Sequence, residues 1–169
     1  MHSVGQCLWF NGQAEEAAAF YVSVFDSGEV LETATYLSGS PSPFPPGSVL
    51  TVKFVLDGVE FLALNGGPDF TFTPAISIVV DCDTQEEVDH FWDRLSEGGA
   101  PGPCGWLTDK FGVSWQVAPR LLDELLASPD REAAQRVFTA MLAMARSKST
   151  RCNGRTTPCE RRVRWTRRR

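Results

Sequence analysis

The feature that most constrains the fold of this chain is an internal repetition in the order of its predicted elements. Residues 4–66 predict a strand, a helix and further strands that end in a hairpin, and residues 74–119 predict the same order. Seven positions match in the two helices at a spacing of 71 residues, as Tyr21 and Trp92 do. In the hairpins, Gly58 and Gly112 match at a spacing of 54 residues. Amphipathicity alone would explain the helices, but the shared order favours a duplicated module.

The repeated pattern predicts an α+β fold of two tandem βαβββ modules followed by C-terminal helices. Asp57-Gly58 is the strongest hairpin signal, and Thr84 with Glu87 forms a capping box in front of the second helix. The predicted strands cover residues 4–10, 30–36, 48–56, 59–65, 76–81, a short run ending at 107, and 113–117. The predicted helices cover residues 14–25, 84–96, 121–126 and 131–144.

Length and composition indicate one domain, which we place at residues 1–145. The chain has 169 residues, of which 43% are hydrophobic, so it can bury a substantial core. No secretory signal or membrane-spanning run is recognised, and the five cysteines form no CxxC pair. We therefore expect reduced thiols in a cytoplasmic protein. The acidic body carries no basic stripe, which argues against nucleic-acid and membrane partners.

The last segment, residues 146–169, differs sharply from the body. It contains ten Lys or Arg residues and one acidic residue, Glu160. Such a basic run attracts phosphates, so a nucleic-acid or membrane tail is one interpretation. We favour a frameshift, because residues 145–159 (ARSKSTRCNGRTTPC) are compatible with a G+C-rich string that, with one G restored after the Met144 codon, reads GKIEVDALQRAYDAV. In either case we expect residues 147–169 to be disordered and without function.

Three stretches carry a resemblance to a known family: LWFNGQAEEAAAFYVSVF (8–25), LDGVEFLALNGGP (56–68), and TQEEVDHFWDRLSEGG with CGWLTDKFGVSWQ (84–116). They resemble the PhnB-like, or 3-demethylubiquinone 3-methyltransferase-like, branch of the vicinal oxygen chelate (glyoxalase and bleomycin-resistance) superfamily. The resemblance implies a cleft formed by two modules of about residues 4–66 and 74–119. It also implies a homodimer in which the sheets of two subunits frame each cleft.

Metal-using members of this superfamily take one ligand from the first strand and one from the last strand of each module, usually His and Glu. The resemblance carries these four positions onto Gln6, Leu62, Ser77 and Gln116. A divalent metal is held by imidazole or carboxylate groups, so the set predicts no metal site. Neither strand-to-helix junction, FNGQAEE or DCDTQEE, has the glycine-rich turn typical of a nucleotide-type cofactor site. We therefore predict no cofactor.

The strand that follows Gly112 divides into an apolar and a polar face. Val113, Trp115 and Val117 alternate with Ser114 and Gln116. We interpret Trp9, Phe61 and Trp115 as core residues beneath the helices. The polar face is either solvent-exposed or the wall of a cleft, and in a cleft the ligand-binding residues are Gln6, Leu62, Ser77, Trp106, Ser114 and Gln116.

Two classes of function remain open at this point. The first is a metal-independent enzyme that acts on a small polar molecule, with Glu60 as general base and Gln116 near the chemistry. The alternative to a general-base role is that Glu60 is an exposed surface carboxylate without a function. The second class is a non-catalytic module that binds or sequesters a small molecule, as in the drug-resistance branch. A metal-dependent lyase or dioxygenase, or a methyltransferase, fits the site positions less well.

Overall fold

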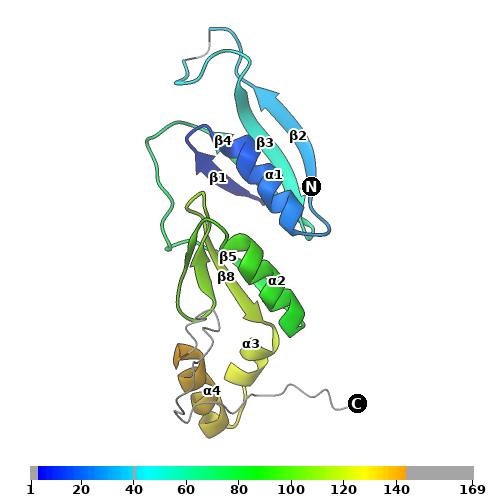
Figure 1. Cartoon of the computed structure of the whole chain (residues 1–169), viewed down its shortest axis with the longest axis vertical. Coiled ribbons are helices and arrows are strands. Elements are labelled where there is room, and N and C mark those ends of the chain that lie inside the picture. The colour runs from blue at the N-terminus through cyan, green and yellow to red at the C-terminus, as the bar shows by residue number, and fades with distance from the viewer. Residues whose placement is uncertain (1–3, 40, 144–169) are drawn as a thin grey trace, which may run out of the picture.

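The computed structural model describes residues 4–39 and 41–143, and it contains the predicted repetition as two modules (Figure 1). The basic tail lies outside the described residues. The first module comprises β1 (Gln6–Phe10), α1 (Ala14–Val24), β2 (Glu29–Thr35), β3 (Val49–Leu56) and β4 (Val59–Asn65). The second comprises β5 (Ile78–Cys82), α2 (Gln85–Leu95), β6 (Ala100–Pro101), β7 (Trp106–Thr108) and β8 (Ser114–Pro119), followed by α3 (Leu121–Leu126) and α4 (Arg131–Ala143). The α+β class and the two-module organisation are confirmed.

The two sheets have the same strand order. Sheet A runs β1-β4-β3-β2 and sheet B runs β5-β8-β7-β6. In each sheet the first strand of the module lies parallel to the last, and the other neighbours are antiparallel. β1 and β5 are therefore equivalent edge strands, and this topological match supports the duplication inferred from the sequence. None of the helices in the described part of the chain is long and apolar enough to cross a membrane.

Local sequence explains where several elements begin and end. Asp57 and Gly58 both have positive φ values, 45° and 81°, as a two-residue hairpin turn requires. The α2 N-terminus has the predicted capping box, since the Thr84 side chain accepts from Glu87 N and the Glu87 side chain accepts from Thr84 N. At the start of α1, Ala14 N donates instead to Asn65 Oδ1 at 2.9 Å, which ties the helix to the end of β4.

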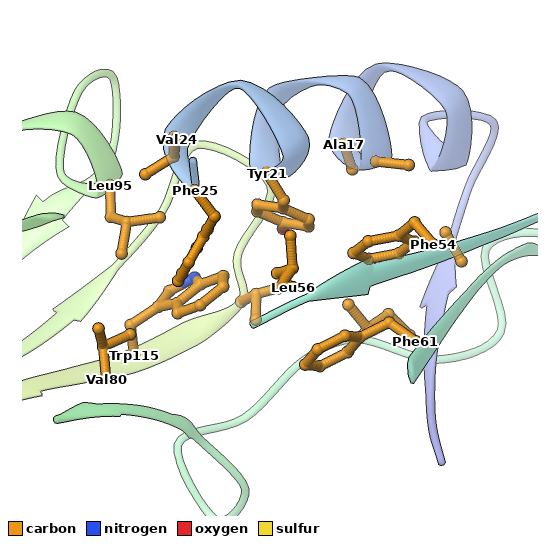
Figure 2. Packing of buried hydrophobic residues seen from close by; sticks show 14 of the residues in the cluster. Ala17, Tyr21, Val24, Phe25, Phe54, Leu56, Phe61, Val80, Leu95 and Trp115 are labelled. Atoms are coloured by element: carbon orange, nitrogen blue, oxygen red, sulfur yellow. The ribbon is translucent and has the colours of Figure 1, made fainter. Parts of the chain in front are cut away.

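Helix α1 lies over sheet A and reaches sheet B, and it contributes to a core that both modules share (Figure 2). Three of its four alanines, Ala14, Ala17 and Ala18, are fully buried, which lets the helix approach sheet A closely. On the same face of the helix, the Tyr21 ring lies 5.3 Å from the ring of Trp115, which is fully buried in sheet B. Both sheets consequently turn their helix-covered faces toward this core, as predicted for Phe61 and Trp115.

Candidate functional site

Each sheet has a second face that points away from the helices, here called its open face. Paired residues on neighbouring strands point to the same side of a sheet, so the strand register identifies these faces. The open face of sheet A carries Cys7, Trp9, Lys53, Glu60 and Leu62. The open face of sheet B carries Ser77, Val79, Trp106, Thr108, Ser114 and Gln116.

The open face of sheet B brings together four of the predicted ligand-binding residues. Gln116 Nε2 donates a hydrogen bond to Ser77 Oγ at 2.7 Å. Trp106 is paired with Gln116 across β7 and β8, so the partly exposed indole lies beside the amide. Ser114 lies two positions before Gln116 and is paired with Thr108. This face is a polar surface with one flat aromatic side chain, as expected for a wall that contacts a small molecule.

The open face of sheet A contains Leu62 and the predicted general base, Glu60. Glu60 Oε2 lies 3.2 Å from Lys53 Nζ, and both side chains are about half exposed. Lys53 was not among the residues predicted from the sequence, although it is the only Lys or Arg before Arg94 and therefore an unusual residue in a strand. As a general base, the Glu60 carboxylate would have to accept a proton either while paired with the Lys53 ammonium group or after the ion pair has separated.

The register of β1 corrects two placements made from the sequence. Leu8 and Phe10 are buried beneath α1, so Gln6 shares their side and is paired with Phe61 rather than Leu62. Cys7 is paired with Leu62 and occupies the first-strand position on the open face that the sequence had assigned to Gln6. Partial burial raises the pKa of the Cys7 thiol. Trp9 also lies on the open face instead of in the core. Its Nε1 donates to Gly67 O at 2.9 Å.

Neither of the two cavities described below is lined by the open faces of both sheets. No strand of sheet A pairs with a strand of sheet B in the part of the chain that the structure describes. A cavity of about 410 Å³ takes its walls from sheet B and from Pro74 in the linker. A larger groove of about 760 Å³ lies between the modules and touches β5 at Ile78, Val79, Val80 and Asp81. Because consecutive strand residues point to opposite faces, this groove follows the free edge of β5.

The side chains at the four candidate metal positions do not suit a divalent metal. With the β1 register corrected, they are Cys7, Leu62, Ser77 and Gln116. The residues that the structure describes contain no group of three or more His, Cys, Asp or Glu side chains placed to hold an ion. One thiol, an alkyl group, a hydroxyl and an amide do not supply the charge or basicity that such an ion requires.

Asp109 is a buried polar residue in the turn between β7 and β8. Its side chain accepts hydrogen bonds from Tyr21 Oη, Trp115 Nε1 and the backbone N–H groups of Phe111 and Val113, at 2.8–3.0 Å. Burial raises the pKa of Asp109 above its usual value, and the four hydrogen bonds oppose this rise. Burial and the nearby carboxylate also raise the pKa of Tyr21. All four donors belong to the core, so Asp109 holds the modules together and does not face a ligand.

Comparison with known proteins agrees with this architecture. The family model for 3-demethylubiquinone-9 3-methyltransferase matches residues 2–118. A Bacillus cereus structure described as a putative 3-demethylubiquinone-9 3-methyltransferase, PhnB protein, is 37% identical with a TM-score of 0.60, and the match covers 69% of this chain and 99% of that one. Protein PA1353 from Pseudomonas aeruginosa is 22% identical with a TM-score of 0.59, over 70% of this chain and 98% of that one.

A third structure, the fosfomycin resistance protein FosX from Listeria monocytogenes complexed with Mn(II) and sulfate, is 17% identical with a TM-score of 0.49, over 68% of this chain and 88% of that one. The chain has no significant match among curated proteins. The family match spans both modules, from the first residues to the end of β8. The chain is therefore a member of the PhnB-like, 3-demethylubiquinone-9 3-methyltransferase family.

Proposed function

We propose that this protein binds a small polar molecule on the open face of sheet B without a metal ion. The observation that carries the proposal is the hydrogen bond between Gln116 Nε2 and Ser77 Oγ, which lies beside the partly exposed Trp106 ring. With one amide N–H engaged, Gln116 keeps a second N–H and its carbonyl oxygen for a ligand, and Ser77 keeps its hydroxyl proton. The pair therefore presents both donors and an acceptor to a neutral polar group.

The methyltransferase activity in the family's name has weaker support. A nucleotide-type cofactor is commonly held by the free N–H groups at a helix N-terminus after a strand. At α1 the Ala14 N–H is bound by Asn65 Oδ1, and at α2 the Glu87 N–H is bound by Thr84 Oγ1. Because side chains of the protein already use these groups, we favour a site on the sheet face over one at a strand-to-helix junction.

We further propose that the site is completed by a second copy of the chain. The open faces of sheets A and B are separate surfaces in one chain, and each sheet has an edge strand, β1 or β5, with no neighbour on its outer side among the described strands. Apolar side chains beside these edges are strongly exposed: Val4 is 98%, Ile76 80% and Val79 55% exposed. Pairing of β1 from one copy along β5 of the other would cover them and bring Glu60 and Lys53 opposite Gln116.

Two functional classes fit this site and differ in what Glu60 does. In an enzyme, Glu60 would accept a proton from the bound molecule while Gln116 and Ser77 orient it. In a binding module, the ion pair of Glu60 with Lys53 would only line the cleft. Turnover of a bound compound that is lost in Glu60→Gln favours the enzyme, and saturable binding without turnover favours the module. The described cysteines, Cys7, Cys82 and Cys104, are free thiols, which fits our proposal of a cytoplasmic protein.

The first experiment identifies small molecules that co-purify with the full chain by mass spectrometry. We expect a bound compound in the native protein and its loss in Gln116→Ala, with Asp69→Asn, an exposed substitution outside both faces, as the control. Light scattering at micromolar concentration should give a dimer. No bound compound, together with no saturable binding from a metabolite panel, would contradict the proposed function.

A subunit-mixing experiment tests whether two copies share each cleft. Gln116→Ala alters the binding residues of sheet B, and Glu60→Ala alters those of sheet A. If each cleft combines sheet A of one copy with sheet B of the other, a heterodimer of the two variants has one cleft with both changes and one with neither. If both substitutions impair binding or turnover singly, random mixing should restore about one quarter of the native sites. No restoration in verified heterodimers would show that each cleft comes from one chain.

A further inference from the structure

The cavity of about 410 Å³ on sheet B lies beside the Ser77–Gln116 pair and is lined by uncharged residues. Its volume is in the range of about 300–1,000 Å³ that is usual for small-molecule pockets. The residues that line it are Pro74, Ala100, Pro101, Gly102, Pro103, Trp106, Leu107, Thr108 and Ser114. They come from the linker, β6, the β6–β7 loop, β7 and the start of β8.

Ser114 lines this cavity as a buried polar residue. Its side chain is only 4% exposed, yet its hydroxyl has no hydrogen-bond partner among the described residues. Thr108 is paired with Ser114 and points to the same side, so two hydroxyl groups lie at the floor of the cavity. A buried hydroxyl without a partner is unfavourable, and a polar atom of a bound molecule would satisfy it.

The walls of the cavity are flat, rigid and uncharged. Three prolines (Pro74, Pro101 and Pro103) have no backbone N–H to offer, and the Gly102 N–H is already donated to Trp106 O at 2.7 Å. Trp106 contributes a flat indole surface on which a ring can stack. The lining, which consists of described residues only, contains no ionisable side chain, so it offers nothing to compensate a buried charge.

From these features we infer that the cavity holds a neutral planar ring whose carbonyl or hydroxyl group hydrogen-bonds to Ser114 and Thr108. The inference rests on the proposed small-molecule function of the same face and names the class of ligand. The ring stacks against Trp106 between the proline walls. Its polar substituent reaches the floor, and the neighbouring Gln116 and Ser77 remain available to the rest of the molecule.

Three small probes that share one ring test this class on the full-length protein. Benzamide carries a neutral carbonyl, toluene has no polar group, and benzoate is charged. We follow the Trp106 indole N–H signal by NMR, identified by its loss in Trp106→Phe. Benzamide should shift this signal in a saturable way, and Ser114→Ala should weaken benzamide binding about three- to tenfold, which is the usual effect of one lost hydrogen bond. Toluene should bind Ser114→Ala as well as it binds the native chain.

The variants keep the result interpretable if one of them folds poorly. Thr108→Val removes the second hydroxyl without changing side-chain shape, and Ser38→Ala is the exposed control that should change nothing. Three results would overturn the inference: benzamide affinity in both Ser114→Ala and Thr108→Val equal to that of the native chain, benzoate binding as tight as benzamide, or no probe binding up to millimolar concentration. Loss of a co-purified ligand in Gln116→Ala but not in Ser114→Ala would overturn this inference while leaving the proposed function intact.

Discussion

Tyr21 Oη donates a hydrogen bond to Asp109 Oδ2 at 2.8 Å, between residues that are 88 positions apart in the sequence. Tyr21 belongs to α1 of the first module, and Asp109 lies in the β7–β8 turn of the second. The same oxygen accepts from Trp115 Nε1, while Oδ1 accepts from two backbone N–H groups. One buried carboxylate thus fixes its own turn and fastens α1 to sheet B.

Asp109→Asn should destabilise the protein. An asparagine oxygen can still accept from the backbone N–H groups, but its NH₂ group would then face the Trp115 Nε1–H, which cannot become an acceptor. We expect a loss of about 1–3 kcal/mol in the free energy of unfolding, measured by urea titration at pH 7. Tyr21→Phe should cost less, because Asp109 keeps three donors. An effect of Asp109→Asn no larger than that of the exposed Asp69→Asn would contradict this role.

The contribution of Asp109 to stability should depend on pH. Burial raises the pKa of Asp109 in the folded protein above its ordinary value of 3.8. The folded state then holds more protons than the unfolded state, so this contribution is complete below pH 3.8 and declines as pH rises through the folded pKa. Urea titrations should show a larger advantage of the native chain over Asp109→Asn near pH 4 than at pH 7. The opposite trend would mean that the hydrogen bonds outweigh desolvation.

Cys82 should resist alkylation in the folded protein. The residue is only 1% exposed, and burial together with Glu87, Asp81 and Asp83 raises the pKa of its thiol to about 11. At pH 8 only about one thiol in a thousand would be the reactive thiolate. Peptide mapping after iodoacetamide treatment should find Cys82 modified in urea but not in buffer. Rapid modification in buffer would show that β5 opens readily.

Gly66 and Trp9 should be energetically coupled. A Cβ atom at Gly66 would lie 2.1 Å from the Trp9 ring, so Gly66→Ala alone must displace the indole and should cost about 1–3 kcal/mol of stability. With Trp9→Leu in the background the clash disappears, and the double variant should lose less than the sum of the single losses. Strict additivity in urea titrations would show that Trp9 does not pack against Gly66 on the open face of sheet A.

Divalent metals should leave the protein's thermal stability unchanged. The side chains at the candidate positions, Cys7, Leu62, Ser77 and Gln116, include neither an imidazole nor a carboxylate group. We expect no stoichiometric metal in protein purified without a chelator and no rise in Tm with zinc, nickel or manganese. A large stabilisation that Gln116→Ala and Ser77→Ala abolish would demonstrate a metal site and contradict this prediction.

Local patterns were sufficient to predict most of the elements. β4 and α3 have the predicted bounds, and α1, α2 and β3 differ by a residue at one or both ends. Their signals are short-range: Asp57-Gly58 determines a hairpin, and Thr84 with Glu87 determines a helix start. β6 gave no such signal, because two residues, Ala100 and Pro101, are too few for a period.

The sequence predicted the candidate site best where the alternation of residues within one strand was enough to identify the exposed face. Ser114 and Gln116 alternate with the buried Val113 and Trp115, so their shared face followed from the strand period alone. In β1 the run Leu8-Trp9-Phe10 is apolar throughout, and alternation there cannot say which side is covered. The packing of Leu8 and Phe10 beneath α1 settled it and moved Cys7 to the position assigned to Gln6.

The sequence by itself determined the duplicated modules, their turns and the polar face of the last strand, because these depend on neighbours a few residues apart. Only the tertiary structure decided the role of Asp109. In the sequence it is an ordinary turn residue, and its role depends on the hydrogen bond that it accepts from Tyr21 of α1. The tertiary structure also decided that sheets A and B share no strand pairing within the described chain. The physical reason is the same in both cases: α1 packs against both sheets at once, and no local pattern records a contact between residues so distant in the sequence.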